Sequence, residues 1–277
     1  MTLSANQLSA IDTFCTLHSA GCFVLPNPWD PGTARYLQHL GFKALATTSA
    51  GFAFARARPD GGVPLDEMLA HVKDIVSATP LPVNADFMNG FADEPENVAV
   101  NVRRCLATGV AGLSIEDSTG KDDPPLYDKT LAIERVRAAR RAIDESGIPA
   151  VLTARCEAFL VGDSNPLATA IDRLTAFAET GADCLYAPGV IDAKEIAAIV
   201  DAVAPKPINV LVSGFNAQLS VGELAQLGVR RISVGSGLAL AAWGAFVRAT
   251  REVASEGKFD SLAQGARSAE LNGLFGR

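Results

Sequence analysis

Short apolar runs rich in β-branched residues alternate along the chain with longer segments whose apolar residues recur at helical spacing. The short runs are typical of buried strands and the longer segments of amphipathic helices. The predicted strands cover the ranges 23–27, 43–49, 82–86, 111–117, 149–155, 182–188, 207–212 and 230–235. The clearest helical segments are 65–78, 94–109, 128–147, 165–181, 237–257 and 261–275.

This alternation predicts the fold class, a TIM-type (β/α)8 barrel. Eight strand–helix units follow one another without a break in composition, whereas a doubly wound sheet usually has about five or six strands. A length of 277 residues suits one large domain, so we expect a single barrel over 1–277. The helices of about 237–277 exceed what closes a barrel, and we expect them to pack on a neighbouring subunit.

Composition and charge exclude several classes of protein. With 48% hydrophobic and 20% charged residues, the chain has enough apolar side chains for a large core. The net charge of −7, without a lysine or arginine run, argues against a nucleic-acid or anionic-membrane partner. No signal peptide or long apolar span is recognisable, so we expect a cytoplasmic protein. Five cysteines without C-x-x-C spacing predict neither disulfides nor structural zinc.

Charged and amide side chains gather where the predicted strands end. Asn84 and Asp86 lie two positions apart on one strand and therefore face the same side, while Asp60 follows an earlier strand. Glu116 and Arg155 end the fourth and fifth strands. In a barrel these ends meet at one mouth, where crowded carboxylates resist ionisation unless a cation neutralises them. Asp60, Asp86 and Glu116 therefore predict a site for a hard divalent cation such as Mg2+.

These residues also have purely structural interpretations. A strand-end carboxylate often caps the next helix, a buried arginine often only ties down an acid, and the small residues 49–51 suit an ordinary turn. Cys156 faces outward by strand alternation and is expected to be an inert thiol. The three histidines lie on predicted helices, which leaves no histidine base. It is the joint placement of the acids and Arg155 that favours a functional site.

Eight short motifs, in order, resemble the isocitrate lyase and phosphoenolpyruvate mutase superfamily. They are NPWDPGTAR, ATTSAGFAF, PDGG, NADFMNGF, SIED, TARCEAF, YAPG and RRISVGS, and they span nearly the whole chain. The resemblance implies a barrel whose last helix is exchanged with a partner subunit, so we expect a homo-oligomer, either a dimer or a tetramer built of dimers. It also implies a Mg2+-dependent enzyme, with Mn2+ as an alternative metal, that works through the enolate of a 2-oxo acid.

The resemblance carries roles to individual positions. The backbone N–H groups of the turn would bind the substrate carboxylate, and the guanidinium would face the enolate oxygen. The expected substrate contacts are Trp29, Ser49, Ala50, Gly51, Asp86, Arg155 and Asn209. The expected metal ligands are Asn84, Asp60, Asp86 and Glu116. The expected catalytic residues are Arg155 and Glu116, together with Lys121, which is chosen from the residues of the loop after the fourth strand and not from the resemblance.

Two motifs depart from the superfamily pattern. The usual Asp-x-Asp pair is here Asn84 and Asp86, and the uncharged amide predicts weaker metal binding, with Asp86 moving into the inner shell. The loop STGKDDPPLYD (118–128) lacks both the Lys-x-Cys-Gly-His motif of isocitrate and methylisocitrate lyases and the asparagine-containing pattern of the phosphonate-forming mutases. Lys121 and Tyr127 remain as its candidates for proton transfer, although a solvated lysine is the commoner fate.

These features predict a lyase-like or decarboxylase-like enzyme that acts on a small 2-oxo acid, a dicarboxylate, or an adduct joined by a C–C bond. Two alternatives stay open: P–C chemistry of the phosphoenolpyruvate or carboxyphosphonoenolpyruvate mutase type, and a 2-oxo acid binding protein with negligible turnover. A Schiff-base aldolase is disfavoured because no lysine ends a predicted strand; Lys43 opens one strand and Lys206 precedes another.

Overall fold

The computed structural model describes residues 4–214 and 218–276, so both ends of the expected 1–277 domain lie outside it. Eight parallel strands form one sheet in the order β1-β8-β7-β6-β5-β4-β3-β2. They are β1 Phe23–Leu25, β2 Leu45–Ala46, β3 Val83–Asp86, β4 Gly112–Glu116, β5 Val151–Arg155, β6 Cys184–Tyr186, β7 Ile208–Leu211 and β8 Arg231–Ser233. The N–H of Ala46 donates to the carbonyl of Pro26 at 3.0 Å and joins β2 to the end of β1. The predicted (β/α)8 barrel is confirmed.

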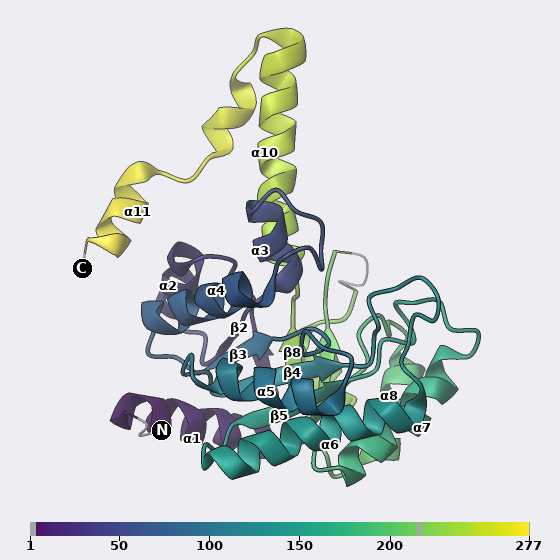
Figure 1. The fold of residues 1–277 in the computed structure, drawn as a ribbon. Coiled ribbons are helices and arrows are strands. Elements are labelled where there is room, and N and C mark those ends of the chain that lie inside the picture. The colour runs from purple at the N-terminus through teal and green to yellow at the C-terminus, as the bar shows by residue number, and fades with distance from the viewer. Residues whose placement is uncertain (1–3, 215–217, 277) are drawn as a thin grey trace.

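Helices follow the strands around the outside of the barrel (Figure 1). The helices are α1 Ala5–Ser19, α2 Pro31–His39, α3 Ser49–Ala55, α4 Leu65–Ala78, α5 Pro95–Leu106, α6 Lys129–Ser146, α7 Pro166–Glu179, α8 Ala193–Val203, α9 Val221–Gln226, α10 Gly237–Glu256, the 3-10 helix η1 Asp260–Gln264 and α11 Ser268–Phe275. The prediction of one continuous helix over 261–275 is wrong. The chain leaves helical geometry at Gly265, where ψ is 157°, and η1 and α11 lie on either side of this break.

The N-terminal helix packs against the strand starts and leaves the opposite end of the barrel open. Phe14 of α1 is fully buried, and its ring lies 6.4 Å from that of Phe23 on β1. The Phe14 ring fits against β4 only because Gly112 lacks a side chain. A Cβ at this position would lie 2.8 Å from Phe14 Cε1. The C-terminal strand ends remain available for a site.

The last helices extend away from the barrel. In Figure 1, α10 stands out from the strands; the chain then turns back, with η1 packed on α10 and α11 lying apart from it on the side of α2. Trp243 and Phe246 on α10 are 41% and 57% exposed. At the other end, the Arg35 guanidinium of α2 lies 5.8 Å from the ring centre of Phe275 on α11. Exchange of these helices between subunits remains a prediction.

Within the described ranges, none of the helices combines the length and the apolar character needed to cross a lipid bilayer.

Candidate active site

A cavity of about 190 Å³ opens at the C-terminal ends of the strands. Barrel enzymes carry their chemistry at this end. The polar residues that line it come from most of the strands and their following loops. They are Asn27, Thr47, Thr48, Ser49, Asp60, Asn84, Asp86, Ser114, Arg155, Tyr186, Asn209, Arg231, Ser233 and Ser236.

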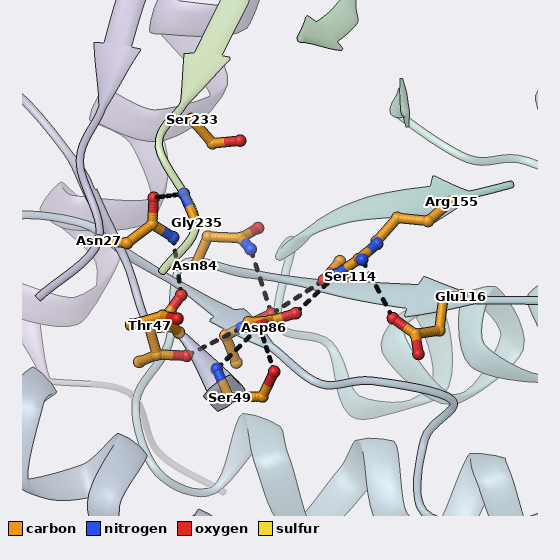
Figure 2. A network of polar contacts seen from close by, with 12 residues as sticks. Asn27, Thr47, Ser49, Asn84, Asp86, Ser114, Glu116, Arg155, Ser233 and Gly235 are labelled. Atoms are coloured by element: carbon orange, nitrogen blue, oxygen red, sulfur yellow. Dashed lines mark hydrogen bonds and ion pairs between the residues drawn. The ribbon is translucent and has the colours of Figure 1, made fainter. Parts of the chain in front are cut away.

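The guanidinium of Arg155, at the end of β5, contacts three carboxylates. Its Nη1 lies 2.8 Å from Asp86 Oδ1, its Nη2 3.2 Å from Glu116 Oε2, and its Nε 2.9 Å from Glu157 Oε1. Figure 2 shows Arg155 reaching toward Asp86 and Glu116 from the neighbouring strand. Burial lowers the pKa of Arg155, but the charges of Glu157, Glu116 and Asp86 raise it well above its ordinary value. The single positive charge of Arg155 therefore faces three carboxylates.

Asp86 also holds the turn that follows β2. Its Oδ2 accepts hydrogen bonds from the Ser49 N–H at 2.9 Å and the Ser49 hydroxyl at 2.8 Å (Figure 2). Ser49 begins the short helix α3, and the N-cap Thr48 accepts the Gly51 N–H at 3.2 Å. Ala50, between these two residues, lines the cavity. An internal carboxylate thus occupies the Ser49 part of the turn that the sequence assigned to the substrate.

The remaining predicted acids lie in different surroundings. Asp60 lines the cavity rim, and its pKa is raised by partial removal from water and by the charge of Asp86. Burial raises the pKa of Glu116 well above its ordinary value; Arg155 opposes this shift and Glu157 adds to it. A nearby cation stabilises the ionised form of a carboxyl group whose pKa is raised in this way.

A magnesium ion fits part of this donor set. The described residues contain no group of three or more His, Cys, Asp or Glu side chains arranged to hold a metal. However, Asn84 is 3% exposed, and its amide oxygen has no hydrogen-bond partner although the residue lines the cavity. Mg2+ usually keeps several waters and takes one or two carboxylates plus a substrate oxygen. Asn84, Asp86 and Asp60 fit an ion completed by water and substrate, without forming a cage in advance.

Four of the predicted site residues lie outside the cavity lining of the described chain, and one of them, Gly51, belongs to the turn that borders it. Glu116 lies on the far side of Arg155 (Figure 2). Lys121 is exposed, and its Nζ lies 3.6 Å from Asp93 Oδ2. Trp29 lines a separate apolar groove against α10, together with Trp243. The other predicted residues, Asn209 included, border the cavity or its turn.

Several lining residues were not assigned to the site from the sequence. Asn27 Oδ1 accepts the N–H groups of Val234 and Gly235 at 3.0 and 2.9 Å, and its Nδ2 donates to the Thr47 carbonyl at 2.8 Å (Figure 2). It thereby fastens the seam between β1, β2 and β8. Strand alternation in RRISVG places Arg231 and Ser233 on one face, a signal that was available in the sequence.

The protein-family model for phosphoenolpyruvate phosphomutase matches residues 14–254 of the chain. The chain belongs to the phosphoenolpyruvate mutase family. Membership confirms the resemblance to the isocitrate lyase and phosphoenolpyruvate mutase superfamily, which includes carbon–carbon lyases.

Three relatives of this mutase and lyase superfamily cover much of the chain. A structure from Burkholderia cenocepacia, described only in general terms as a lyase/mutase, is 46% identical with a TM-score of 0.95 and covers 99% of this chain and 98% of its own. The oxaloacetate decarboxylase of Pseudomonas aeruginosa is 28% identical, over 92% of this chain and 87% of that protein. The 2-methylisocitrate lyase of Salmonella typhimurium is 30% identical, over 65% of this chain and 62% of that protein.

Proposed function

We propose that the protein is a Mg2+-dependent decarboxylase or lyase of a small 2-oxo dicarboxylate such as oxaloacetate, acting through an enolate. The observation that carries this proposal is the Arg155 guanidinium at the barrel mouth, held by three carboxylates beside the Ser49 turn. The oxaloacetate decarboxylase of Pseudomonas aeruginosa, similar over 92% of the chain, supports this choice of substrate class.

Substrate binding exchanges one carboxylate for another. The substrate carboxylate takes the N–H groups of the turn at Ser49 and Ala50, and it displaces Asp86 from the Ser49 N–H. Asp86, once released, turns its oxygens toward the region of Asn84 and Asp60, where the magnesium ligands would gather. This exchange explains why the described residues hold suitable metal donors but no finished cage.

The 2-oxo oxygen then faces Arg155. Loss of the C4 carboxylate as CO2 leaves the electron pair of the C3–C4 bond in an enolate, and negative charge develops on that oxygen. A guanidinium already fixed in place stabilises this charge without reorganisation. A bound Mg2+ would supply Lewis-acid stabilisation of the same charge.

The loop between β4 and α6 favours decarboxylation over aldol-type cleavage. The Tyr127 hydroxyl donates a short hydrogen bond to Asp93 and accepts one from Asn89 at 3.1 Å, while Lys121 pairs with Asp93. Burial, with Asp93 adding to it, raises the pKa of Tyr127 to about 12. Both proton-transfer candidates of the loop are thus engaged elsewhere. Loss of CO2 needs no acid at the leaving group, whereas aldol-type cleavage also requires removal of a hydroxyl proton.

Turnover assays with a panel of substrates test the proposal. Purified protein is incubated with oxaloacetate, 2-methylisocitrate or phosphonopyruvate, with Mg2+ or with EDTA, and products are followed by NMR. We expect pyruvate and CO2 from oxaloacetate with Mg2+, loss of activity in EDTA, and recovery on adding Mg2+. Conversion of phosphonopyruvate alone would replace the proposal by mutase chemistry. Binding without any product would indicate a 2-oxo acid binding protein.

A further inference from the structure

Arg231 is a buried cation without a carboxylate partner among the described residues. It is 2% exposed on β8, and its contacts are neutral: Nε donates to Asn209 Oδ1 at 2.8 Å, and Nη1 lies 3.3 Å from His18 Nε2. A buried guanidinium is costly unless its hydrogen-bond donors are well used. Two of its donors orient polar side chains: His18 at the closed end of the barrel and Asn209 in the active-site cavity.

The His18 contact has a single possible direction. His18 Nδ1 lies 2.7 Å from the Phe14 carbonyl, and a carbonyl oxygen only accepts, so Nδ1 carries the hydrogen. Nε2 is then the acceptor for Arg231. Burial and the charge of Arg231 lower the pKa of His18 to about 3, so the ring stays neutral at physiological pH. The contact with His18 of α1 therefore holds the guanidinium at the strand-start end of the barrel.

The contact with Asn209 fixes the direction of the next hydrogen bond. Because a guanidinium has only donors, the amide oxygen of Asn209 must face Arg231. The amide nitrogen consequently donates to Ser233 Oγ, at 2.9 Å. Ser233 accepts this bond, which leaves its own hydrogen free. These two hydrogen bonds both point from Arg231 toward Ser233 and the cavity.

The chain ends at Tyr186 on β6. Ser233 and Tyr186 both line the cavity, and the Ser233 hydroxyl opposes the rise in the pKa of the Tyr186 phenol, as a hydrogen-bond partner does. On the other side, the Arg155 guanidinium carbon lies 5.0 Å from the Tyr186 ring centre, and a guanidinium cannot accept a hydrogen bond. With Ser233 as the donor to the phenol oxygen, the phenol hydrogen is free to point into the cavity. Burial raises the pKa of Tyr186 to about 12, so this hydrogen is present at neutral pH.

We infer that Tyr186 is the acid that protonates the enolate carbon, and that Arg231, through Asn209 and Ser233, is the positioning residue that directs it. This inference rests on the proposed function. After CO2 has left, C3 of the enolate forms a bond to the phenol hydrogen, and the electron pair of the O–H bond stays on the Tyr186 oxygen. The keto form of pyruvate results. Ser233 donates to the tyrosinate and Arg155 lies beside it until water returns a proton.

The inference is tested on ketonisation, which does not depend on decarboxylation. Enolpyruvate is generated from phosphoenolpyruvate by a phosphatase, and its conversion to pyruvate is followed with lactate dehydrogenase and NADH. Wild-type protein with Mg2+ should accelerate ketonisation, and Tyr186→Phe should lower that acceleration by about 100-fold, as expected for loss of a general acid. Tyr36→Phe, on the outer helix α2, is the matched control and should match the wild type.

A second variant tests the direction of the hydrogen-bond chain. Asn209→Asp keeps the side-chain volume and gains an ion pair with Arg231, so folding should be preserved. Two carboxylate oxygens only accept, so Ser233 would have to donate to position 209 and withdraw its hydrogen from Tyr186. We expect ketonisation to slow by about tenfold. A merely structural role for this chain would leave the rate of a folded Asn209→Asp protein unchanged.

Decarboxylation and ketonisation separate the two claims. With oxaloacetate, Tyr186→Phe should release CO2 ahead of keto-pyruvate, because free enolpyruvate leaves the site and ketonises in water. If the wild type accelerates ketonisation but releases no CO2, the proposed function fails while the assignment of Tyr186 stands. If the wild type does not accelerate ketonisation, or Tyr186→Phe keeps CO2 and pyruvate in step at the wild-type rate, the assignment of Tyr186 is overturned.

Discussion

At the scale of single residues, the proposed function gives Asp86 and Arg155 the task of receiving the substrate anion. Asp86 occupies the Ser49 N–H that we propose for the substrate carboxylate, and it is itself held by Arg155 at 2.8 Å. A ligand carboxylate can replace Asp86 at both groups with little change in charge. Two further acids, Glu116 and Glu157, keep the guanidinium in place during the exchange.

Arg155→Lys should therefore impair function more than its preserved charge suggests. A lysine ammonium is a point charge on a flexible stem and cannot hold three acids in fixed directions, as the planar guanidinium does. We expect kcat for oxaloacetate to fall by about 100-fold or more, the range seen when a preorganised oxyanion donor is removed. Arg141→Lys, at a surface pair with Glu96, is the control. Wild-type kcat in Arg155→Lys would remove Arg155 from the chemistry.

Metal affinity should fall as the pH falls. Partial desolvation and Asp86 raise the pKa of Asp60, so protons compete with Mg2+ at this residue at higher pH than at an exposed carboxylate. Calorimetry at a series of pH values between about 5 and 8 should show weaker Mg2+ binding near pH 5. An unperturbed carboxyl group, with a pKa of about 4, would already be mostly ionised at that pH. Asp60→Asn should flatten this dependence, and the surface variant Asp172→Asn should not. A flat wild-type profile would contradict the account.

At the scale of elements, strand positions were predictable because an apolar, β-branched run bounded by turns has few alternatives. All eight strands occur, each shorter than predicted, since hydrogen-bonded pairing ends before the apolar run does. The break at Gly265 was not predictable, because helical periodicity continues across it. The contacts of Lys121 with Asp93, and of Trp29 with the α10 groove, depend on how loops and helices pack, which residue spacing does not specify.

Much of the cavity lining followed from one rule, that polar strand ends meet at the mouth of a barrel. The rule brought together Asn84, Asp86 and Arg155 with the Ser49 turn. It did not find Arg231, because a charged residue early in a strand usually suggests an exposed position. Its guanidinium is accommodated by neutral partners on α1 and β7, a pairing that requires knowledge of the fold.

Gly112 on β4 offers a test of how an element positions the site. A Cβ there would lie 2.8 Å from Phe14 Cε1 and 3.1 Å from Asn84 Oδ1. Gly112→Ala should destabilise the protein by about 1–3 kcal/mol through overpacking, measured as a lower Tm, and should weaken Mg2+ binding by moving the Asn84 amide. In Gly222→Ala the nearest atom, Ser220 Oγ, would lie at 3.9 Å, so this helix variant should be neutral or stabilising. Unchanged Tm and affinity in Gly112→Ala would contradict the packing described.

At the scale of the whole molecule, the apolar surface of the last helices is the main feature that one subunit leaves uncovered. Trp243 and Phe246 are in edge contact with ring centres 5.5 Å apart, and both are exposed. Apolar area left in water costs about 25 cal/mol per Å2, and contiguous patches of this kind usually mark an interface. We expect a second copy of the chain to cover this surface.

Light scattering tests this assembly. The full-length protein should be a dimer or tetramer, and deleting residues 258–277 should give smaller, less stable species. Trp243→Glu combined with Phe246→Glu should likewise lower the molar mass, because charges at a buried apolar contact oppose association. Val221→Glu, at an exposed apolar residue of α9, should leave the mass unchanged. A full-length protein that is monomeric at micromolar concentration would show the expectation to be wrong.

A crystal structure with Mg2+ and oxalate tests the central claim most directly, because oxalate mimics the planar enolate of a 2-oxo acid. The account predicts oxalate at the C-terminal mouth, with one carboxylate on the N–H groups of Ser49 and Ala50 in place of Asp86, and with its other oxygens facing Arg155. The metal should lie between oxalate and the released Asp86. Oxalate bound at the opposite end of the barrel, or an Asp86 that keeps its hydrogen bonds to Ser49 with oxalate bound elsewhere, would contradict it.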